Sequence, residues 1–137
     1  MANLVVTMTG LQLMLDDLRT HYFNAACLLH LFKNAKTPAI GDNLGMYQEC
    51  DFPGYAPVAI HSWGTAHDSG SQSSETDHPP VTFTCNGTTV PNTIYGYYVT
   101  DGSSNLLWAQ ADPNPFYINT AGQTYTVTGQ FLLADLP

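Results

Sequence analysis

The second half of the chain, from Pro79 to Leu136, alternates apolar and polar positions in short runs. The runs are VTFTC, NTIYGYYVT, NLLWAQA and QTYTVTGQFLL, and turn-forming Gly, Asn, Pro and Asp residues separate them. Such alternation predicts antiparallel strands with one buried face. We therefore expect strands around 81–85, 93–100, 105–111 and 123–133.

Two earlier segments also have β character. Ala26–Lys33 is an apolar run with His30 in its middle, which predicts a buried strand. Tyr55–Trp63 follows the turn dipeptide Pro53-Gly54, and its Pro57 places this strand at a sheet edge or a bulge. The expected fold is mainly β: an antiparallel β-sandwich or jelly-roll-like barrel of about seven or eight strands.

One short amphipathic helix precedes the strands. Between Leu11 and Tyr22, apolar residues recur at helical spacing, and Thr9 or Gly10 is expected to cap the helix start. The buried stripe should consist of Leu11, Met14, Leu15, Leu18 and Tyr22. We expect a single β-rich domain over residues 1–137, with 1–25 as an N-terminal arm and helix. The helix covers an open end of the sandwich or docks on a neighbouring subunit.

The segment Gly64–Pro80 is rich in Ser, Gly, Thr, Asp and His and has no apolar period. This composition predicts a long exposed loop, ordered only against a partner. Five side chains in or beside it could ligate a metal: His61, His67, Asp68, Asp77 and His78. Their spacing matches no standard zinc pattern, so we expect no metal and no cofactor.

Charged residues make up only 10% of the chain, against about 25% in an ordinary soluble domain. The formal net charge is −8, with Arg19, Lys33 and Lys36 as the cations. Nucleic acid and anionic membranes are therefore poor partners. No apolar run reaches the ~20 residues that span a bilayer. A low-charge surface rich in Thr, Ser, Asn and Tyr favours packing against copies of the chain, although a polar secreted-type domain would have similar composition.

The three cysteines, Cys27, Cys50 and Cys85, are odd in number and form no CxxC pair. Buried reduced thiols in a protein made in the cytoplasm account for them best. The N-terminus has no cationic segment ahead of an apolar one and does not resemble a signal peptide. There is no GxSxG elbow and no base beside a cysteine, so we expect no catalytic residues and no enzyme.

Aromatic residues are the remaining candidates for function. They could form a sugar-stacking platform, but they are also the usual filling of β cores and protein interfaces, which we favour. Consecutive strand residues point to opposite faces, so one of Tyr97 and Tyr98 should face outward. The set consists of Trp63, Tyr95, Tyr97, Tyr98, Trp108, Phe116, Tyr117 and Tyr125.

The order of several short segments along the chain is informative. The segments are LLHLFKN with Thr37-Pro38, DFPGYAPVAI, Trp63, VTFT, IYGYYVTD, LLWAQ and GQTYTVTGQFLL. From about Leu28 to Leu133 the chain resembles small β-rich virion structural proteins of tailed bacteriophages. The resemblance implies a location on the virion, after synthesis in the host cytoplasm. It also implies a head decoration (cement) protein that binds the major capsid protein and stabilises the capsid lattice.

Decoration proteins of this kind usually assemble as homo-oligomers, often trimers. For the subunit interface we expect contributions from Tyr97, Tyr98 and Phe116, and from Leu4, Val5 and Val6 in the Met1–Thr9 segment. The alternatives are a tail, baseplate or fibre-associated subunit and, in different classes, a carbohydrate-binding module or a small enzyme. A glycan-binding module should be monomeric and bind sugars in isolation, whereas a cement protein should oligomerise and bind capsids.

Overall fold

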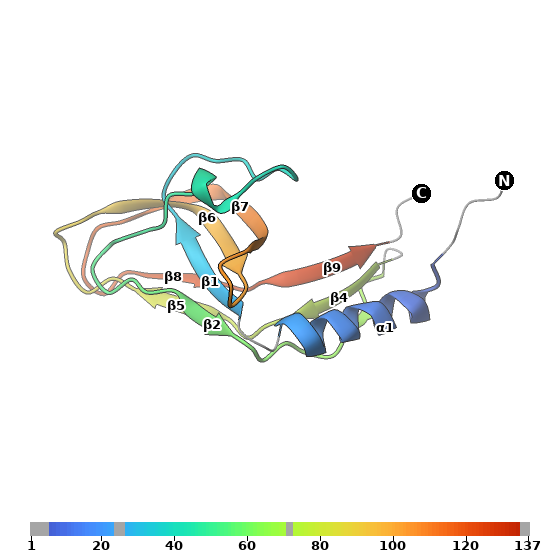
Figure 1. The fold of residues 1–137 in the computed structure, drawn as a ribbon. Helices are drawn as coiled ribbons and strands as arrows, with labels where there is room; N and C mark the ends of the chain where they lie inside the picture. Colours follow the sequence, from blue (N-terminus) through green and yellow to red (C-terminus); the bar gives the residue numbers. More distant parts are fainter. Residues whose placement is uncertain (1–5, 24–26, 71–72, 135–137) are drawn as a thin grey trace. The chain divides into compact units, whose positions relative to one another are not determined.

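A computed structural model describes residues 6–23, 27–70 and 73–134 (Figure 1). Strands hold 41% of the chain and helical segments 15%, and the sheets are antiparallel and do not close into a barrel. The expected mainly β class is therefore confirmed, and the arrangement is consistent with a β-sandwich rather than a barrel. Contacts divide the chain into two compact units. Unit 1 comprises Met1–Ala26, Ile60–Pro79 and Thr128–Pro137, and unit 2 comprises Cys27–Ala59 and Pro80–Val127. The expectation of a single domain stays a prediction.

The larger sheet has four antiparallel strands in the order β2-β1-β6-β7. Pairing of β1 with β6 runs from Leu28↔Thr100 to Phe32↔Gly96. Pro57 directly precedes β2 at the sheet edge, as its missing N–H group predicts. The bounds are β1 Cys27–Phe32, β2 Val58–Ile60, β6 Asn92–Thr100 and β7 Leu106–Ile118.

Unit 2 also contains a two-stranded sheet of β5, Val81–Thr84, and β8, Thr124–Val127. The expected strand over 123–133 is therefore two strands, because Thr128 and Gly129 separate β8 from β9, Gln130–Ala134. The strand expected over 105–111 is β7, which continues to Ile118 despite its two prolines. β7 lies at the other edge of the larger sheet, where proline is tolerated.

Strand β6 is central in its sheet, and both of its faces are covered. Tyr97 is 7% exposed and Tyr98 is 3% exposed, so the prediction that one of them faces outward is wrong. The Tyr98 ring belongs to a core cluster with Phe32 and Tyr47. On the other face, the Tyr97 hydroxyl donates to Gln110 Oε1 at 2.9 Å. A strand buried on both faces accepts an aromatic residue at each of two consecutive positions.

Helix α1 of unit 1 spans Met8–Leu18 and continues as a π-helical turn, Arg19–Phe23. Its N-cap is Thr7, whose hydroxyl accepts from Gly10 N at 3.1 Å, so the expected cap at Thr9 or Gly10 is wrong. The hydroxyl at Thr7 captures one of the free N–H groups of the first turn, and the helix therefore starts earlier.

The buried stripe of this helix is narrower than the spacing predicted. Leu11 and Leu15 are buried, whereas Met14 and Tyr22 are more than half exposed. A π-helical turn contains more residues than an α-helical one. It therefore rotates Tyr22 away from the buried side and brings in Phe23, which is 4% exposed.

Unit 1 also contains a three-stranded sheet in the order β3-β4-β9, of which β4 and β9 are labelled in Figure 1. Strands β3, His67–Asp68, and β4, Ser73–Asp77, lie inside the segment that we expected to be an irregular exposed loop, so that prediction is wrong. Ser74 and Thr76 are fully buried. The segment forms strands because its inward residues are small and polar and satisfy their hydroxyl groups with backbone carbonyls.

Candidate functional site

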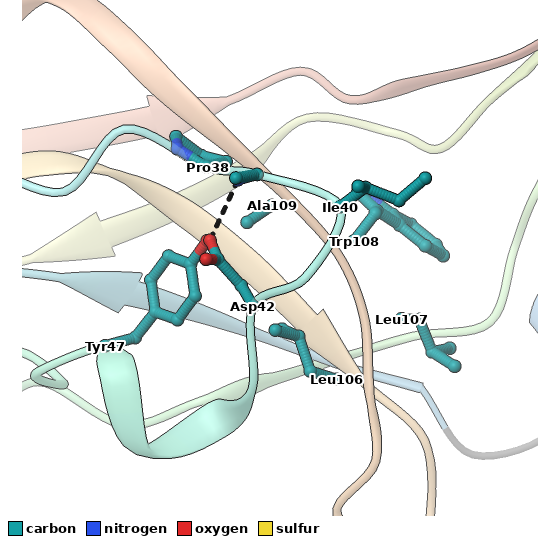
Figure 2. A pocket seen from close by; sticks show the side chains of 9 residues that line it. Pro38, Ile40, Asp42, Tyr47, Leu106, Leu107, Trp108 and Ala109 are labelled. Carbon is teal, nitrogen blue, oxygen red and sulfur yellow. Dashed lines mark hydrogen bonds between the residues drawn. The ribbon is translucent and has the colours of Figure 1, made fainter.

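A pocket of about 340 Å³ in unit 2 lies between the start of β7 and the segment 38–47 (Figure 2). Two of its lining side chains, Asp42 and Tyr47, are polar. The others are apolar: Pro38, Ala39, Ile40, Leu106, Leu107, Trp108 and Ala109. Apolar side chains around a few fixed polar groups are the usual lining of a binding site.

Asp42 holds the chain around this pocket in place. Its carboxylate accepts hydrogen bonds from Tyr47 Oη at 2.6 Å and Ala39 N at 2.9 Å, two residues of the pocket lining (Figure 2). It also accepts from Lys36 Nζ at 2.8 Å. The Lys36 ammonium, the Tyr47 hydroxyl and the Ala39 N–H group together lower the pKa of Asp42 to about 2. Burial and the neighbouring carboxylate raise the pKa of Tyr47. The carboxylate is therefore ionised near neutral pH, and most of its acceptor positions are already used.

Ile40 projects from a tight turn that this network supports. The turn closes with a hydrogen bond from Asp42 N to Ala39 O at 3.0 Å. The Asn34 side chain joins the chain before this turn to the chain after it. Its Nδ2 donates to Met46 O at 3.0 Å, and its Oδ1 accepts from Gln48 N at 2.8 Å. The Ile40 side chain is 109% exposed, more than that of any other large apolar residue among those the structure describes. A rigidly supported exposed isoleucine has the form of an interface anchor.

The opposite wall of the pocket comes from β7. Trp108 is half-buried, and a hydrogen bond joins its side chain to the Tyr97 hydroxyl, which in turn donates to Gln110. Since the indole N–H is the only donor of tryptophan, this chain of hydrogen bonds orients the ring that lines the pocket. The neighbouring Leu107 is 37% exposed. The β7 side of the pocket therefore presents the apolar side chains of Leu107 and Trp108, and the hydrogen bond to Tyr97 holds Trp108 in its orientation.

The expected interface residues lie elsewhere. Tyr97 and Tyr98 are buried within the chain, and Phe116 is half-buried against Tyr125, with ring centroids 5.9 Å apart. Val6 is also half-buried, while Leu4 and Val5 lie outside the described residues. A role of these residues between subunits stays a prediction. Sequence reasoning missed Ile40, although an isoleucine between Pro38 and Gly41, two turn-forming residues, is a signal for an exposed apolar tip.

A second polar constellation surrounds His30. The His30 Nδ1 atom lies 2.6 Å from Glu49 Oε1, and Nε2 lies 2.9 Å from Thr100 Oγ1. Tyr55 Oη also donates to Glu49 at 2.8 Å. Hydroxyl, imidazole and carboxylate thus follow the order of a catalytic triad. However, Thr100 is only 3% exposed, and Tyr98 stacks on the imidazole at 4.6 Å. This network ties β1 and β6 to the 49–55 segment, and its hydroxyl oxygen is closed to substrate.

The three cysteines are buried thiols, as expected. Burial raises the pKa of Cys50 to about 12 and also raises the pKa of Cys27. Because the thiolate is the reactive form, these two side chains are poor nucleophiles.

The side chains considered as metal ligands are distributed over the sheet of unit 1. His61 is exposed, and His78 is buried with Nδ1 2.7 Å from Pro79 O. Asp68 accepts from Gly70 N at 2.7 Å. Only His67 and Asp77 come together, and they do so with Glu75, which sequence reasoning did not include. The alternation of Glu75 and Asp77 with buried Ser74 and Thr76 was the missed signal of a shared strand face.

No family model matches this chain, and neither the curated proteins nor the solved structures contain a significant match. Among the described residues, no helix has both the length and the apolar character that crossing a membrane requires.

Proposed function

We propose that this protein is a bacteriophage virion structural protein, a capsid decoration protein that assembles as a homo-oligomer on the outside of the head. The observation that carries the proposal is Ile40, which is fully exposed on a turn held by Asp42 and lies beside a pocket that residues of β7 also line. We call this surface the Ile40 site: Pro38, Ile40, Leu107 and Trp108.

The Ile40 site is suited to mechanical attachment. Fully burying an isoleucine side chain contributes about 1.5–3 kcal/mol, a modest amount for one contact. Because the turn is already fixed by hydrogen bonds, little conformational entropy is lost when a partner covers it. On a symmetric particle each copy repeats the same contact, so modest contacts add up to a strong clamp on neighbouring capsid subunits.

The charges of the chain support a protein partner over a nucleic acid. Each of its three cations is already within 3.0 Å of an aspartate: Arg19 with Asp16, Lys33 with Asp51 and Lys36 with Asp42. Phosphate contacts would have to break one of these pairs, in a chain whose net charge is −8. The partner we propose is the major capsid protein.

The proposed location on a virion rests on the motif resemblance between about Leu28 and Leu133. The Ile40 site supports the proposed contact with another protein. The same resemblance allows a tail, baseplate or fibre-associated subunit as the alternative. A carbohydrate-binding module is the rival of a different class, favoured by the half-buried Trp108 ring in the pocket wall. The Asp42 carboxylate counts against it, since Lys36, Tyr47 and Ala39 already occupy the acceptors that sugar hydroxyls would need.

The test combines particle imaging with one matched pair of variants. Purified protein is mixed with capsids and with complete particles that lack it, and ordered extra density is sought by electron microscopy. Ile40→Asp should lose at least tenfold in affinity, about 1.4 kcal/mol or more, because a charge would be buried in an apolar contact. Val90→Asp is the control, since Val90 is also exposed in unit 2 but lies outside the pocket.

Each outcome decides between the candidates. Density at symmetry positions on the head, lost with Ile40→Asp and kept with Val90→Asp, supports the proposal. Density on the tail alone selects the alternative. A monomer by light scattering that decorates no particle and binds glycans in isolation selects the carbohydrate-binding module.

A further inference from the structure

Beyond attachment, the small sheet of unit 1 gathers three metal-ligating side chains on one face. Strands β3 and β4 pair with His67 directly opposite Glu75. Glu75 and Asp77 are two residues apart on β4 and therefore point to the same side. Since opposite residues of an antiparallel pair also share a face, the backbone itself brings the three side chains together.

Their ligand atoms lie close to one another. One nitrogen or oxygen atom from each of the three residues lies within 4.8 Å of the other two. His67 Nε2 and Glu75 Oε1 are 2.9 Å apart. Two ligands of one ion with bonds of about 2.0–2.2 Å are separated by roughly this distance. Small side-chain rotations would place all three on a common ion.

The orientation of the imidazole is fixed from outside the cluster. His67 Nδ1 lies 3.2 Å from the backbone carbonyl of Thr65, to which it can donate its proton. His67 Nε2 and Glu75 Oε1 are hydrogen-bond partners, and a metal ion would take the place of the proton between them. A backbone carbonyl that holds the second nitrogen in this way is the usual outer partner of a metal-bound histidine.

The charges around the cluster are mainly negative, and the His67 imidazole is the group paired with Glu75. The Glu75 side chain is 19% exposed, and the exposed Asp77 brings a second carboxylate beside it. All three Lys and Arg side chains of the chain are paired with other aspartates. Two carboxylates and one imidazole thus form a site of net charge −2 when the imidazole is neutral.

We propose that His67, Glu75 and Asp77 form a binding site for a divalent transition-metal ion of the Zn²⁺ or Mn²⁺ type, with water completing the coordination shell. Sequence analysis predicted no metal, because spacing along the chain does not reveal ligands that strand pairing brings together. The imidazole nitrogen favours Zn²⁺ over Ca²⁺ and Mg²⁺, which prefer oxygen ligands alone. The ion would tie β3 to β4 and stabilise the small sheet.

The site is tested by metal titration of protein first treated with a chelator. Calorimetry should show one Zn²⁺ per chain, Co²⁺ should give the visible absorption of a nitrogen-and-oxygen site, and the melting temperature should rise with bound ion. Glu75→Gln and Asp77→Asn should each weaken Zn²⁺ binding by more than about tenfold, the loss seen when even an outer partner of a ligand is removed. Mg²⁺ and Ca²⁺ should bind more weakly than Zn²⁺.

Asp68→Asn is the matched control. It removes one negative charge from the same strand, but Asp68 neighbours His67 in β3 and points to the other face. It should therefore bind Zn²⁺ like the parent protein. The metal-free variants are compared by circular dichroism, and Asp77 is exposed, so its replacement leaves the fold intact. Equal binding by Asp77→Asn and the parent, or substoichiometric binding by the parent, would overturn the proposal.

Discussion

Strand β6 of unit 2 and strand β4 of unit 1 are built on opposite principles. The buried positions of β6 hold large apolar and aromatic side chains, among them Ile94, Tyr98 and Val99. The buried positions of β4 hold Ser73, Ser74 and Thr76, whose neighbours accept or donate hydrogen bonds. Apolar burial dominates the stability of the first strand, whereas the second depends on satisfied polar groups.

The chain has one tryptophan in each unit, so the unfolding of each unit can be followed by fluorescence. Its two tryptophans are Trp63 in unit 1 and Trp108 in unit 2. Trp63→Phe therefore leaves a fluorescence signal from unit 2 alone, and Trp108→Phe leaves one from unit 1 alone. Denaturant unfolding of these two backgrounds measures the two units separately.

The largest effect is expected at Gly96 of β6, where φ is +153°. A Cβ atom there would lie 2.8 Å from the Phe32 ring and closer still to the Gln110 carbonyl oxygen. Gly96→Ala should lower the free energy of unfolding of unit 2 by about 3 kcal/mol or more, through backbone strain and overpacking together. The measurement is urea unfolding followed by Trp108 fluorescence.

Gly122→Ala separates these two causes. Gly122 also has a positive φ, +93°, but a Cβ atom there meets nothing within 4 Å. Gly122→Ala should therefore lower the free energy of unfolding of unit 2 by only about 1 kcal/mol, which is the contribution of backbone strain alone. Equal losses at the two glycines would show that the close packing around β6 contributes little.

The same contrast explains what the sequence could and could not predict. The strands of unit 2 were found at 26–33, 81–85 and 93–100 because their apolar residues recur at period 2 or in continuous runs. Strand β4 has the same period, but its inward positions are Ser and Thr, which a hydrophobic pattern does not detect. Its identity depends on carbonyl partners such as Gly64 O, which are contributed by other segments of the chain.

The candidate sites were missed for a related reason. Ile40 stands alone between turn residues, and only its 109% exposure distinguishes it from a core isoleucine. Glu75 joins His67 through strand pairing, a relationship between segments that spacing along the chain does not contain. The buried cysteines were predicted because their number and apolar context are local properties.

A smaller effect is expected at Thr76, which tests the polar side of the comparison. Thr76 is fully buried, and its hydroxyl donates to Gly64 O. Thr76→Val keeps the shape but leaves this carbonyl without its hydroxyl donor, so unit 1 should lose about 1 kcal/mol. Trp63 fluorescence in the Trp108→Phe background reports the change.

Thr82→Val in β5 is the matched substitution in unit 2. Thr82 is exposed, and its hydroxyl lies 2.9 Å from that of Thr126 across the strand pair. The loss should stay within about 0.5 kcal/mol, because water replaces the missing partner. If Thr76→Val instead stabilised unit 1, hydrogen bonding would not be what holds its inward face.

A pH dependence is also expected in unit 2, where Asp42 supports the Ile40 turn. Its pKa is about 2 in the folded chain, against 3.8 for the free side chain, because Lys36, Tyr47 and Ala39 stabilise the charged form. A carboxyl group whose folded pKa is lowered stabilises the fold fully above its unfolded pKa. That contribution is lost as the pH falls from about 4 through about 2.

Asp42→Asn should therefore weaken unit 2 at pH 7 and flatten its stability curve between about pH 4 and 2. Tyr47→Phe removes one donor to the carboxylate and should give an intermediate curve, since Lys36 and Ala39 remain. Asp51, whose pKa is lowered by Lys33 and Asn92, keeps part of the acid dependence in both variants. Acid unfolding followed by Trp108 fluorescence gives all three curves. If the slope of stability against pH is the same in Asp42→Asn and the parent, the Asp42 carboxylate does not hold the Ile40 turn. The backbone hydrogen bonds of the turn would then be sufficient to keep the shape of the pocket wall.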